Sequence, residues 1–359
     1  MRGEYMNNIY DVAVIGGGPA GATFSAELAA ISPENRILLV DGAGDGHVKV
    51  CGGLLAPDAQ KVLAKMNMTL PNSVLADPQI FAVETVDLVT RRMRYYQRHY
   101  LNMKRDAFDK WLLSNVPESV DVVGGMCVSV SRDGDGFKIS VRRGDAQTEY
   151  SSRTLVGADG GGSVVRRKFF GREIKQYVAL QQWFGGAKVP YYSCIFDKET
   201  SPSCSWTMMK DGFSIYGGAF EKDGCREAFE KQKKRFEEFY GVNLGEPIKT
   251  EACLVSSPRR MRDFITGRDG VFLVGEAAGF ISASSFEGIS SAIVSGKILA
   301  DAFADGIEPQ KILWLYRRRT RGLRLKLCLK MRKRAVLCSP ALRGLIMKSG
   351  VKSVKKYNI

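Results

Sequence analysis

The 359-residue sequence has no long apolar run, few histidines and no closely spaced cysteine pair. Because a membrane-spanning helix needs about 20 apolar residues, no such helix is expected. Only two histidines occur, His47 and His99, and the eight cysteines include no CxxC pair, so no metal site is predicted. Residues 1–11 lack the apolar stretch and cleavage site of an export signal, which predicts a cytoplasmic protein with reduced cysteines.

Acidic residues are absent after Glu308, and this absence makes the end of the chain strongly basic. Residues 311–359 hold sixteen lysines and arginines, so the net charge of +15 leaves about −1 for the rest of the chain (+15 minus +16). Leucines mixed with the basic residues favour contact with an anionic membrane surface, peripheral at the inner membrane face. A solvated surface, or one that compensates cofactor phosphates, is the alternative.

The pattern of this basic segment leaves two further points open. Residues 323–331 alternate with a period of two, so the sequence does not define an amphipathic helix there. Nucleic acid is the weakest of the anionic partners, because no nucleic-acid-binding motif accompanies the charge.

A glycine-rich turn, GGGPAG, lies near the N-terminus between an apolar run and a helical pattern. In such a G-x-G-x-x-G motif, the glycines allow a tight turn, close approach of the backbone to a pyrophosphate, and packing of the helix on the strand. A second apolar run, RILLVD, ends in an acid twenty residues later, where a carboxylate that binds a ribose hydroxyl is expected. The predicted dinucleotide contacts are Gly16, Gly18, Pro19, Ala20, Gly21 and Asp41.

Two later stretches, TLVGADGGGSVVRRKF and GVFLVGEAAGF, each run from an apolar strand into a glycine-rich turn. They resemble the DG and GD motifs of FAD-dependent oxidoreductases of the p-hydroxybenzoate hydroxylase fold. The resemblance implies that the cofactor is FAD, that Glu276 meets its ribityl or ribose hydroxyls, and that a helix beginning near Gly288 lies under the flavin. The residues that it assigns to FAD are Arg105, Asp159, Gly160, Gly275, Glu276, Gly279, Gly288 and Ile289.

The stretch KVCGGLLAP places Cys51 before two glycines, Gly52 and Gly53. It resembles the CGG element of geranylgeranyl reductases, which lies beside the reactive ring of the flavin, where the glycines leave room for ring and substrate. Trp206 and Gly218 resemble the substrate-side Trp…Gly signature of the same family. The match there is incomplete, because the tyrosine and the Phe-Pro of the family are replaced by Cys204, Met208 and Met209.

Further stretches widen the resemblance to most of the chain. KVCGGLLAPDAQ, DPQIFAVETVDL and VGEAAGFISASSFEGIS are similar to the CbrA-type flavoproteins of enteric bacteria. This similarity implies an FAD oxidoreductase of the geranylgeranyl-reductase type and supplies no substrate.

Cys51 and Trp206 are the candidate catalytic residues, and each has a structural alternative. Cys51 is a redox thiol, a proton donor or a small residue that fills a tight site, and thiol chemistry requires exposure and a lowered pKa. Lys49 would favour a thiolate only if its side chain turned toward Cys51. Trp206 either forms a wall of the substrate or flavin site or belongs to the core.

The expected fold class is α/β, with a Rossmann-like FAD-binding domain, an interleaved antiparallel β substrate domain and a basic C-terminal segment. Alternating apolar residues and many aromatics favour a sheet that covers the flavin and lines an apolar pocket. The expected ranges are 1–79, 104–175 and 262–310 for the FAD-binding domain, 80–103 and 176–261 for the substrate domain, and 311–359 for the basic segment.

The expected function is reduction of carbon–carbon double bonds in an isoprenoid-like lipid, with reduced flavin as hydride donor. One alternative is a flavin monooxygenase that hydroxylates an aromatic or polyketide substrate; against it, Gly279 and Phe280 stand where aromatic-ring hydroxylases tend to have histidine and proline. Another is a non-enzymatic, flavin-bearing, membrane-associated sensor. The substrate is a small molecule or lipid, and the electron donor stays open because no second nucleotide motif stands out.

Overall fold

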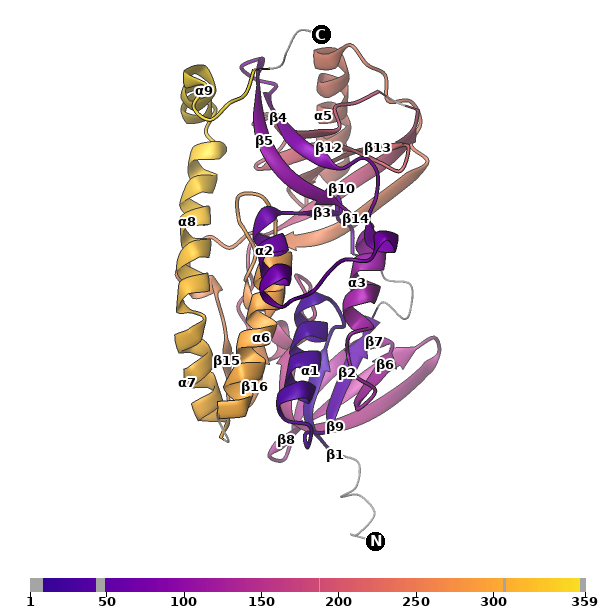
Figure 1. Ribbon diagram of the computed structural model, residues 1–359, viewed down its shortest axis with the longest axis vertical. Helices are drawn as coiled ribbons and strands as arrows, with labels where there is room; N and C mark the ends of the chain where they lie inside the picture. Colours follow the sequence, from indigo (N-terminus) through magenta and orange to yellow (C-terminus); the bar gives the residue numbers. More distant parts are fainter. Residues whose placement is uncertain (1–8, 43–48, 187, 306–307, 356–359) are drawn as a thin grey trace.

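The computed structural model describes residues 9–42, 49–186, 188–305 and 308–355. Residues 1–8 of the stretch examined for an export signal, His47, and residues 356–359 of the basic segment lie outside this part of the chain. Two eight-stranded sheets form the molecule, one above the other in Figure 1, and both are flanked by helices. The structure confirms the expected mixed α/β fold.

The first sheet has the order β15-β16-β9-β1-β2-β6, and β7 and β8 extend from β9 as an antiparallel meander. Strands β16, β9, β1, β2 and β6 run parallel. The apolar sequences of β2 and β16 and of the second half of β1 fit strands that are covered on both faces. The strands of this sheet are β1 (Ile9–Ile15), β2 (Ile37–Asp41), β6 (Val120–Gly124), β7 (Met126–Asp133), β8 (Gly136–Arg143), β9 (Ala146–Gly157), β15 (Gly267–Arg268) and β16 (Val271–Leu273).

Helices α1 (Pro19–Ile31) and α6 (Ile289–Asp305) pack side by side over the first sheet (Figure 1). Their contact is close because Gly296 has no side chain: a Cβ there would lie 2.5 Å from the carbonyl oxygen of Ala20. Three shorter helices, α2 (Pro57–Lys65), α3 (Arg105–Leu113) and α4 (Val164–Phe170), follow strands or loops that lead toward the candidate site. The helix expected after the first glycine-rich turn and the helix expected to begin near Gly288 are both present.

The second sheet has the order β14-β10-β13-β12-β11-β4-β5-β3 and is antiparallel except where β11 pairs with β4. Helix α5 (Cys225–Tyr240) covers it through a core of aromatic side chains, among them Tyr216, Phe220, Phe229 and Phe236. The short strand β3 joins this sheet from within the range expected for the FAD-binding domain. The strands are β3 (Leu54–Leu55), β4 (Ile80–Asp87), β5 (Arg92–Asn102), β10 (Gln176–Gly185), β11 (Tyr192–Phe196), β12 (Cys204–Lys210), β13 (Phe213–Phe220) and β14 (Lys249–Ser256).

The basic segment forms three helices, α7 (Pro309–Arg319), α8 (Arg321–Leu337) and α9 (Pro340–Ser349). Helices α7 and α8 make a long rod that runs along both halves of the molecule (Figure 1). Ion pairs fasten the rod to the body, because Lys326 and Lys330 lie 3.3 and 3.4 Å from Asp58. Residues 323–331, which alternate with a period of two, lie within helix α8 and are helical, and Leu327 is buried against the core.

Candidate functional site

Three glycine-rich turns meet at one edge of the first sheet. Gly157, at the end of β9, pairs with Ile15 at the end of β1 and with Leu273 at the end of β16. Because these strands are parallel, their carboxyl ends lie at the same edge, which is where α/β sheets bind ligands. The sequence-predicted motifs are thus brought together although they are far apart in the chain.

The turn between β1 and α1 combines crowded and open glycines. Gly16 has φ +111°, and a Cβ there would lie 2.6 Å from the carbonyl oxygen of Ala158; a Cβ at Gly21 would collide with the carbonyl oxygen of Gly16. In contrast, a Cβ at Gly18 would meet nothing within 4 Å in the described part of the chain. The N-terminus of α1 is therefore open to a ligand, and its first N–H groups suit a phosphate.

Asp41 lies at the end of β2, beside this turn. A Cβ at Gly17 would lie 2.6 Å from the Oδ1 atom of Asp41, and the N–H of Gly16 donates to the carbonyl oxygen of Val40 at 2.8 Å. The carboxylate of Asp41 therefore lies beside the glycine-rich turn, where it was expected to accept a hydrogen bond from a ribose hydroxyl. That contact itself remains a prediction.

Asp159 and Gly160 form the turn after β9. The carboxylate of Asp159 accepts hydrogen bonds from the Ser163 hydroxyl at 2.5 Å and from the N–H groups of Val164 and Val165 at 2.7 and 3.2 Å. Burial raises the pKa of Asp159, although these donors favour its charged form. Its side chain caps helix α4, while Gly160 is the open position of the turn, with φ +71°. The predicted FAD contact of Asp159 remains a prediction.

Glu276 is buried in the short 3-10 helix Gly275–Ala278 that follows β16. Its Oε1 atom accepts from the Ser256 N–H at 2.8 Å, and its Oε2 atom pairs with the Lys49 ammonium. Burial alone would lower the pKa of Lys49, but the Glu276 charge raises it. Lys49 thus directs its ammonium to Glu276.

The glycines of GEAAGF and the start of α6 serve the packing around this edge. A Cβ at Gly275 would lie 2.9 Å from the Cβ of Ala20, and one at Gly279 would lie 2.7 Å from the carbonyl oxygen of Asp263. Gly288 directly precedes the first residue of α6, Ile289. Gly275 thus lies close to Ala20 of α1 and to Ala292 of α6.

The segment Cys51–Gly53 lies against strand β12 of the second sheet. The N–H of Gly53 donates to the Cys51 sulfur at 3.4 Å. A Cβ at Gly52 would lie 2.8 Å from the Met208 sulfur, and one at Gly53, which has φ +68°, would collide with the Lys210 amine. The glycines therefore make room for side chains of β12.

Trp206 is brought to the same place. A Cβ at Gly52 would lie 3.9 Å from the Trp206 indole nitrogen, and a Cβ at Gly217 would lie 2.6 Å from it. This nitrogen is buried and has no hydrogen-bond partner among the described residues. Since a buried donor without a partner is costly, it suits an acceptor on a bound group.

Arg105 begins helix α3 and completes the surroundings of Cys51. It pairs with Asp109 at 2.8 Å, and its side chain is 12% exposed. Burial alone would lower its pKa, but the Asp109 carboxylate and the Cys51 sulfur raise it. Trp206 and Arg105 thus both lie near the Cys51–Gly53 segment, and the contact of these residues with a flavin remains a prediction.

Sequence reasoning missed two residues here, Lys210 and Cys253. Lys210 closes strand β12 and is 4% exposed, and the Cys253 thiol donates to the carbonyl oxygen of Val50 at 3.6 Å. Burial raises the pKa of Cys253 to about 11. For Lys210, the available sequence signal was a charged residue at the end of an uncharged strand, SWTMMK.

These features fit FAD. The open N-terminus of α1 at Gly18 suits the pyrophosphate, Asp41 and the Lys49–Glu276 pair suit hydroxyl groups, and the unpartnered Trp206 nitrogen lies beside the Cys51 segment. Within the described ranges, no cluster of three histidine, cysteine or acidic residues could hold a metal ion. None of the described helices has the length and apolar character to cross a membrane.

The two-sheet architecture, with glycine-rich turns at the carboxyl edge of a parallel sheet, defines the fold of flavin-dependent oxidoreductases and monooxygenases. The chain has a TM-score of 0.77 with a geranylgeranyl bacteriochlorophyll reductase-like protein of Thermoplasma acidophilum, at 20% identity, covering 94% of this chain and 91% of the other. With the p-nitrophenol 4-monooxygenase PnpA of Pseudomonas putida the TM-score is 0.67, at 13% identity, covering 95% and 93%.

Sequence comparison gives the family. The chain is 44% identical to protein CbrA of Escherichia coli O6:H1 over 349 residues, which cover 95% of this chain and 94% of the relative. No protein-family profile matches it. The chain belongs to the CbrA family, as its sequence motifs indicated.

Proposed function

We propose that this protein is an FAD-dependent oxidoreductase that reduces carbon–carbon double bonds of an isoprenoid-like lipid. The carrying observation is that the Cys51–Gly53 segment lies near both Trp206 and Arg105. The pair of Lys49 with Glu276 ties this segment to the turn after β16, at the carboxyl edge of the parallel sheet. The fold likeness to a geranylgeranyl bacteriochlorophyll reductase-like protein supports the choice.

Different residues have different roles in such a reduction. The α1 turn and Asp41 hold the nucleotide, and the Lys49–Glu276 pair presents polar atoms to the hydroxyl chain. The chemistry that reduced FAD supplies when bound is hydride donation. Cys51 offers a proton at its thiol, Arg105 keeps a positive charge beside that sulfur, and Trp206 forms an apolar wall that excludes water.

The deciding experiment follows the flavin spectrum. The protein with bound FAD is reduced without oxygen and mixed with a polyprenyl lipid, and the lipid is analysed by mass spectrometry. Reoxidation with a gain of two hydrogens on the lipid supports the reductase. Inertness to lipid, with fast substrate-stimulated reaction with oxygen, supports the monooxygenase instead. Bound FAD without turnover by any electron donor supports a sensor.

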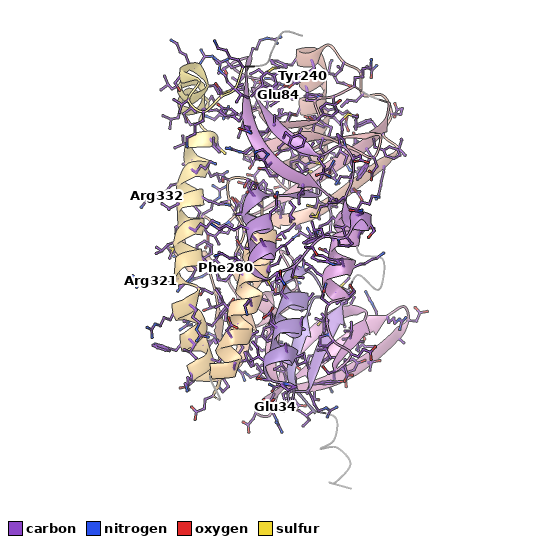
Figure 2. The ribbon with its side chains drawn as sticks, viewed as in Figure 1. Glu34, Glu84, Tyr240, Phe280, Arg321 and Arg332 are labelled. Atoms are coloured by element: carbon purple, nitrogen blue, oxygen red, sulfur yellow. The ribbon has the colours of Figure 1, made fainter. Side chains whose placement is uncertain are left out.

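We further propose that the protein works at an anionic membrane surface as a peripheral cytoplasmic protein. One stripe of α7 and α8, at spacings of three and four residues, faces away from the body and mixes apolar with basic side chains. Arg321 and Arg332 of this stripe point outward in Figure 2. The members of the outer stripe are Trp314, Arg318, Arg321, Leu325, Leu329 and Arg332, and all are exposed.

Vesicle sedimentation tests this surface. With vesicles that contain phosphatidylserine, Arg321→Glu/Arg332→Glu is expected to weaken binding by about thirtyfold or more, since each basic residue near the surface contributes about 1 kcal/mol. The control Arg142→Glu/Arg143→Glu makes the same charge change on strand β8 and is expected to bind normally. Equal loss in both variants, or no binding by the native protein, would remove the outer stripe as a membrane contact.

A further inference from the structure

Lys210 carries a buried ammonium whose partners are backbone carbonyls. Its Nζ atom donates to the carbonyl oxygens of Met103 at 2.5 Å, Gly52 at 2.8 Å and Gly53 at 3.4 Å. The residue as a whole is 4% exposed. These hydrogen bonds replace part of the hydration that the ammonium has lost on burial.

The carbonyls belong to two separate segments. Gly52 and Gly53 form the segment that holds Cys51, and Met103 stands two residues before Arg105, at the start of α3. One ammonium therefore joins strand β12, the Cys51 segment and the entrance of α3. Gly53 must be glycine for this arrangement, because a Cβ there would collide with the Lys210 amine and with the Met103 carbonyl oxygen.

The charged form of Lys210 is less stable in this position than it is in water. Burial lowers its pKa to about 8, and the nearby Cys51, Asp211 and Asp106 offset only part of that effect. Lys104 lowers it further, but the Lys104 ammonium lies 3.6 Å from Asp211, which partly neutralises it. Arg105, which also lies near Cys51, keeps its charge throughout the neutral range.

We propose that Lys210 is a positioning residue that holds the Cys51–Gly53 segment against β12, and so fixes where the Cys51 thiol lies relative to Arg105. The inference concerns the segment itself; its meaning for catalysis rests on the proposed flavin function. It assigns a specific task to a residue outside the motifs of the sequence.

A pH profile follows from this arrangement. If the segment opens, water reaches Lys210 and its pKa returns toward the ordinary value of 10.5, so the open form binds a proton more tightly than the closed form. Between about pH 8 and about pH 10.5, raising the pH therefore favours the closed form, by up to about tenfold per pH unit. The neutral amine still donates hydrogen bonds to the carbonyls, but it no longer carries the cost of a buried charge. Below about pH 8 both forms are protonated, and this contribution is constant.

Amide hydrogen exchange of residues 50–56, corrected for the intrinsic exchange rate at each pH, measures the opening directly in protein without added flavin. We expect the opening constant to fall as the pH rises from about 8 to about 10. Lys210→Met is expected to flatten the profile and, because it has lost the hydrogen bonds to Gly52 and Met103, to open more readily than the native protein at about pH 10. Lys104→Met, which removes a neighbouring exposed charge, is expected to retain the profile. Repeating the series with Cys51→Ser removes the ionisation of the thiol.

Two results would overturn the proposal. A flat profile in the native protein would show that opening does not hydrate Lys210, and this result needs no variant to fold. A profile that persists in Lys210→Met would assign the pH dependence to another group. Because no flavin or substrate is used, either result is independent of whether the protein proves to be a reductase.

Discussion

At the scale of single residues, the glycines of the candidate site are of two kinds. Some are needed because the backbone packs closely against them, and others leave space for a ligand. Gly21 lies against the carbonyl oxygen of Gly16, and Gly16 against that of Ala158. Gly18 faces open space and has φ −69°, which any residue can adopt. The same motif therefore contains a structural position and a ligand position, and substitution distinguishes them.

Gly18→Ala is expected to leave the thermal unfolding midpoint of the flavin-free protein almost unchanged and to weaken FAD binding about tenfold or more, because the added methyl group occupies the approach of the pyrophosphate. Gly21→Ala is expected to lower both stability and FAD binding. Calorimetric unfolding and flavin fluorescence titration measure the two effects. Normal FAD affinity in Gly18→Ala would place the pyrophosphate elsewhere.

Trp206 gives a second test at this scale. If bound FAD lies beside its indole nitrogen, as we propose, energy transfer and stacking quench its fluorescence. Trp206→Phe is therefore expected to lose most of the FAD-induced quenching, while the matched variant Trp314→Phe, on the outer stripe, is expected to retain it. Equal quenching in both variants would contradict a flavin beside Trp206.

At the scale of elements, helix α9 is anchored by a buried ion pair. The Arg343 guanidinium lies 2.8 and 3.0 Å from the Oδ2 atom of Asp87 at the end of β4, and the two side chains are 3% and 0% exposed. The Oδ1 atom of Asp87 also accepts hydrogen bonds from the N–H groups of Val89 and Thr90, so both carboxylate oxygens have partners. The pair connects the end of the basic segment to the second sheet.

Removing one partner of such a pair leaves the other charge buried. Arg343→Met is expected to lower the free energy of unfolding by about 3–5 kcal/mol, measured by urea denaturation. The control Lys348→Met removes an exposed charge from the same helix and is expected to change it by less than about 0.5 kcal/mol. Similar values for both variants would show that α9 contributes little to stability.

The elements differ in how much of them the sequence predicts. The strand, turn and helix around Gly16–Gly21 follow from local patterns, because a buried parallel strand and a glycine turn are short-range features. The partner of Lys49 does not follow, since Glu276 lies 227 residues away in the chain. Lys210 was missed for the same reason: its contacts with Gly52 and Met103 join segments 158 and 107 residues apart.

At the scale of the whole molecule, the candidate site is shared between the two sheets. The turns come from the first sheet, whereas Trp206, Met208 and Lys210 come from β12 of the second. The rod of α7 and α8 also touches both halves: Tyr316 donates to the carbonyl oxygen of Leu273, and Arg334 donates to that of Pro202. We therefore expect the halves to unfold together.

FAD is expected to raise the single unfolding midpoint of both halves, since a ligand at about one hundred times its dissociation constant stabilises by about 2.7 kcal/mol. Far-ultraviolet circular dichroism and tryptophan fluorescence are expected to give coincident curves with and without FAD. Two separate transitions, of which FAD moves only one, would show that the site belongs to one half alone.

The pairing of Gly157 with residues of β1 and β16 also determines when the site can form during synthesis of the chain. The site needs the turn after Ile15, the turn after Gly157 and the start of α6 at Ile289. A ribosome that adds about 5–20 residues per second takes roughly 15 to 60 s to extend the chain from the first of these to the last. If the protein binds FAD as proposed, nascent chains that end before α6 are expected to lack part of the site, and cofactor loading is expected only shortly before the basic helices are made.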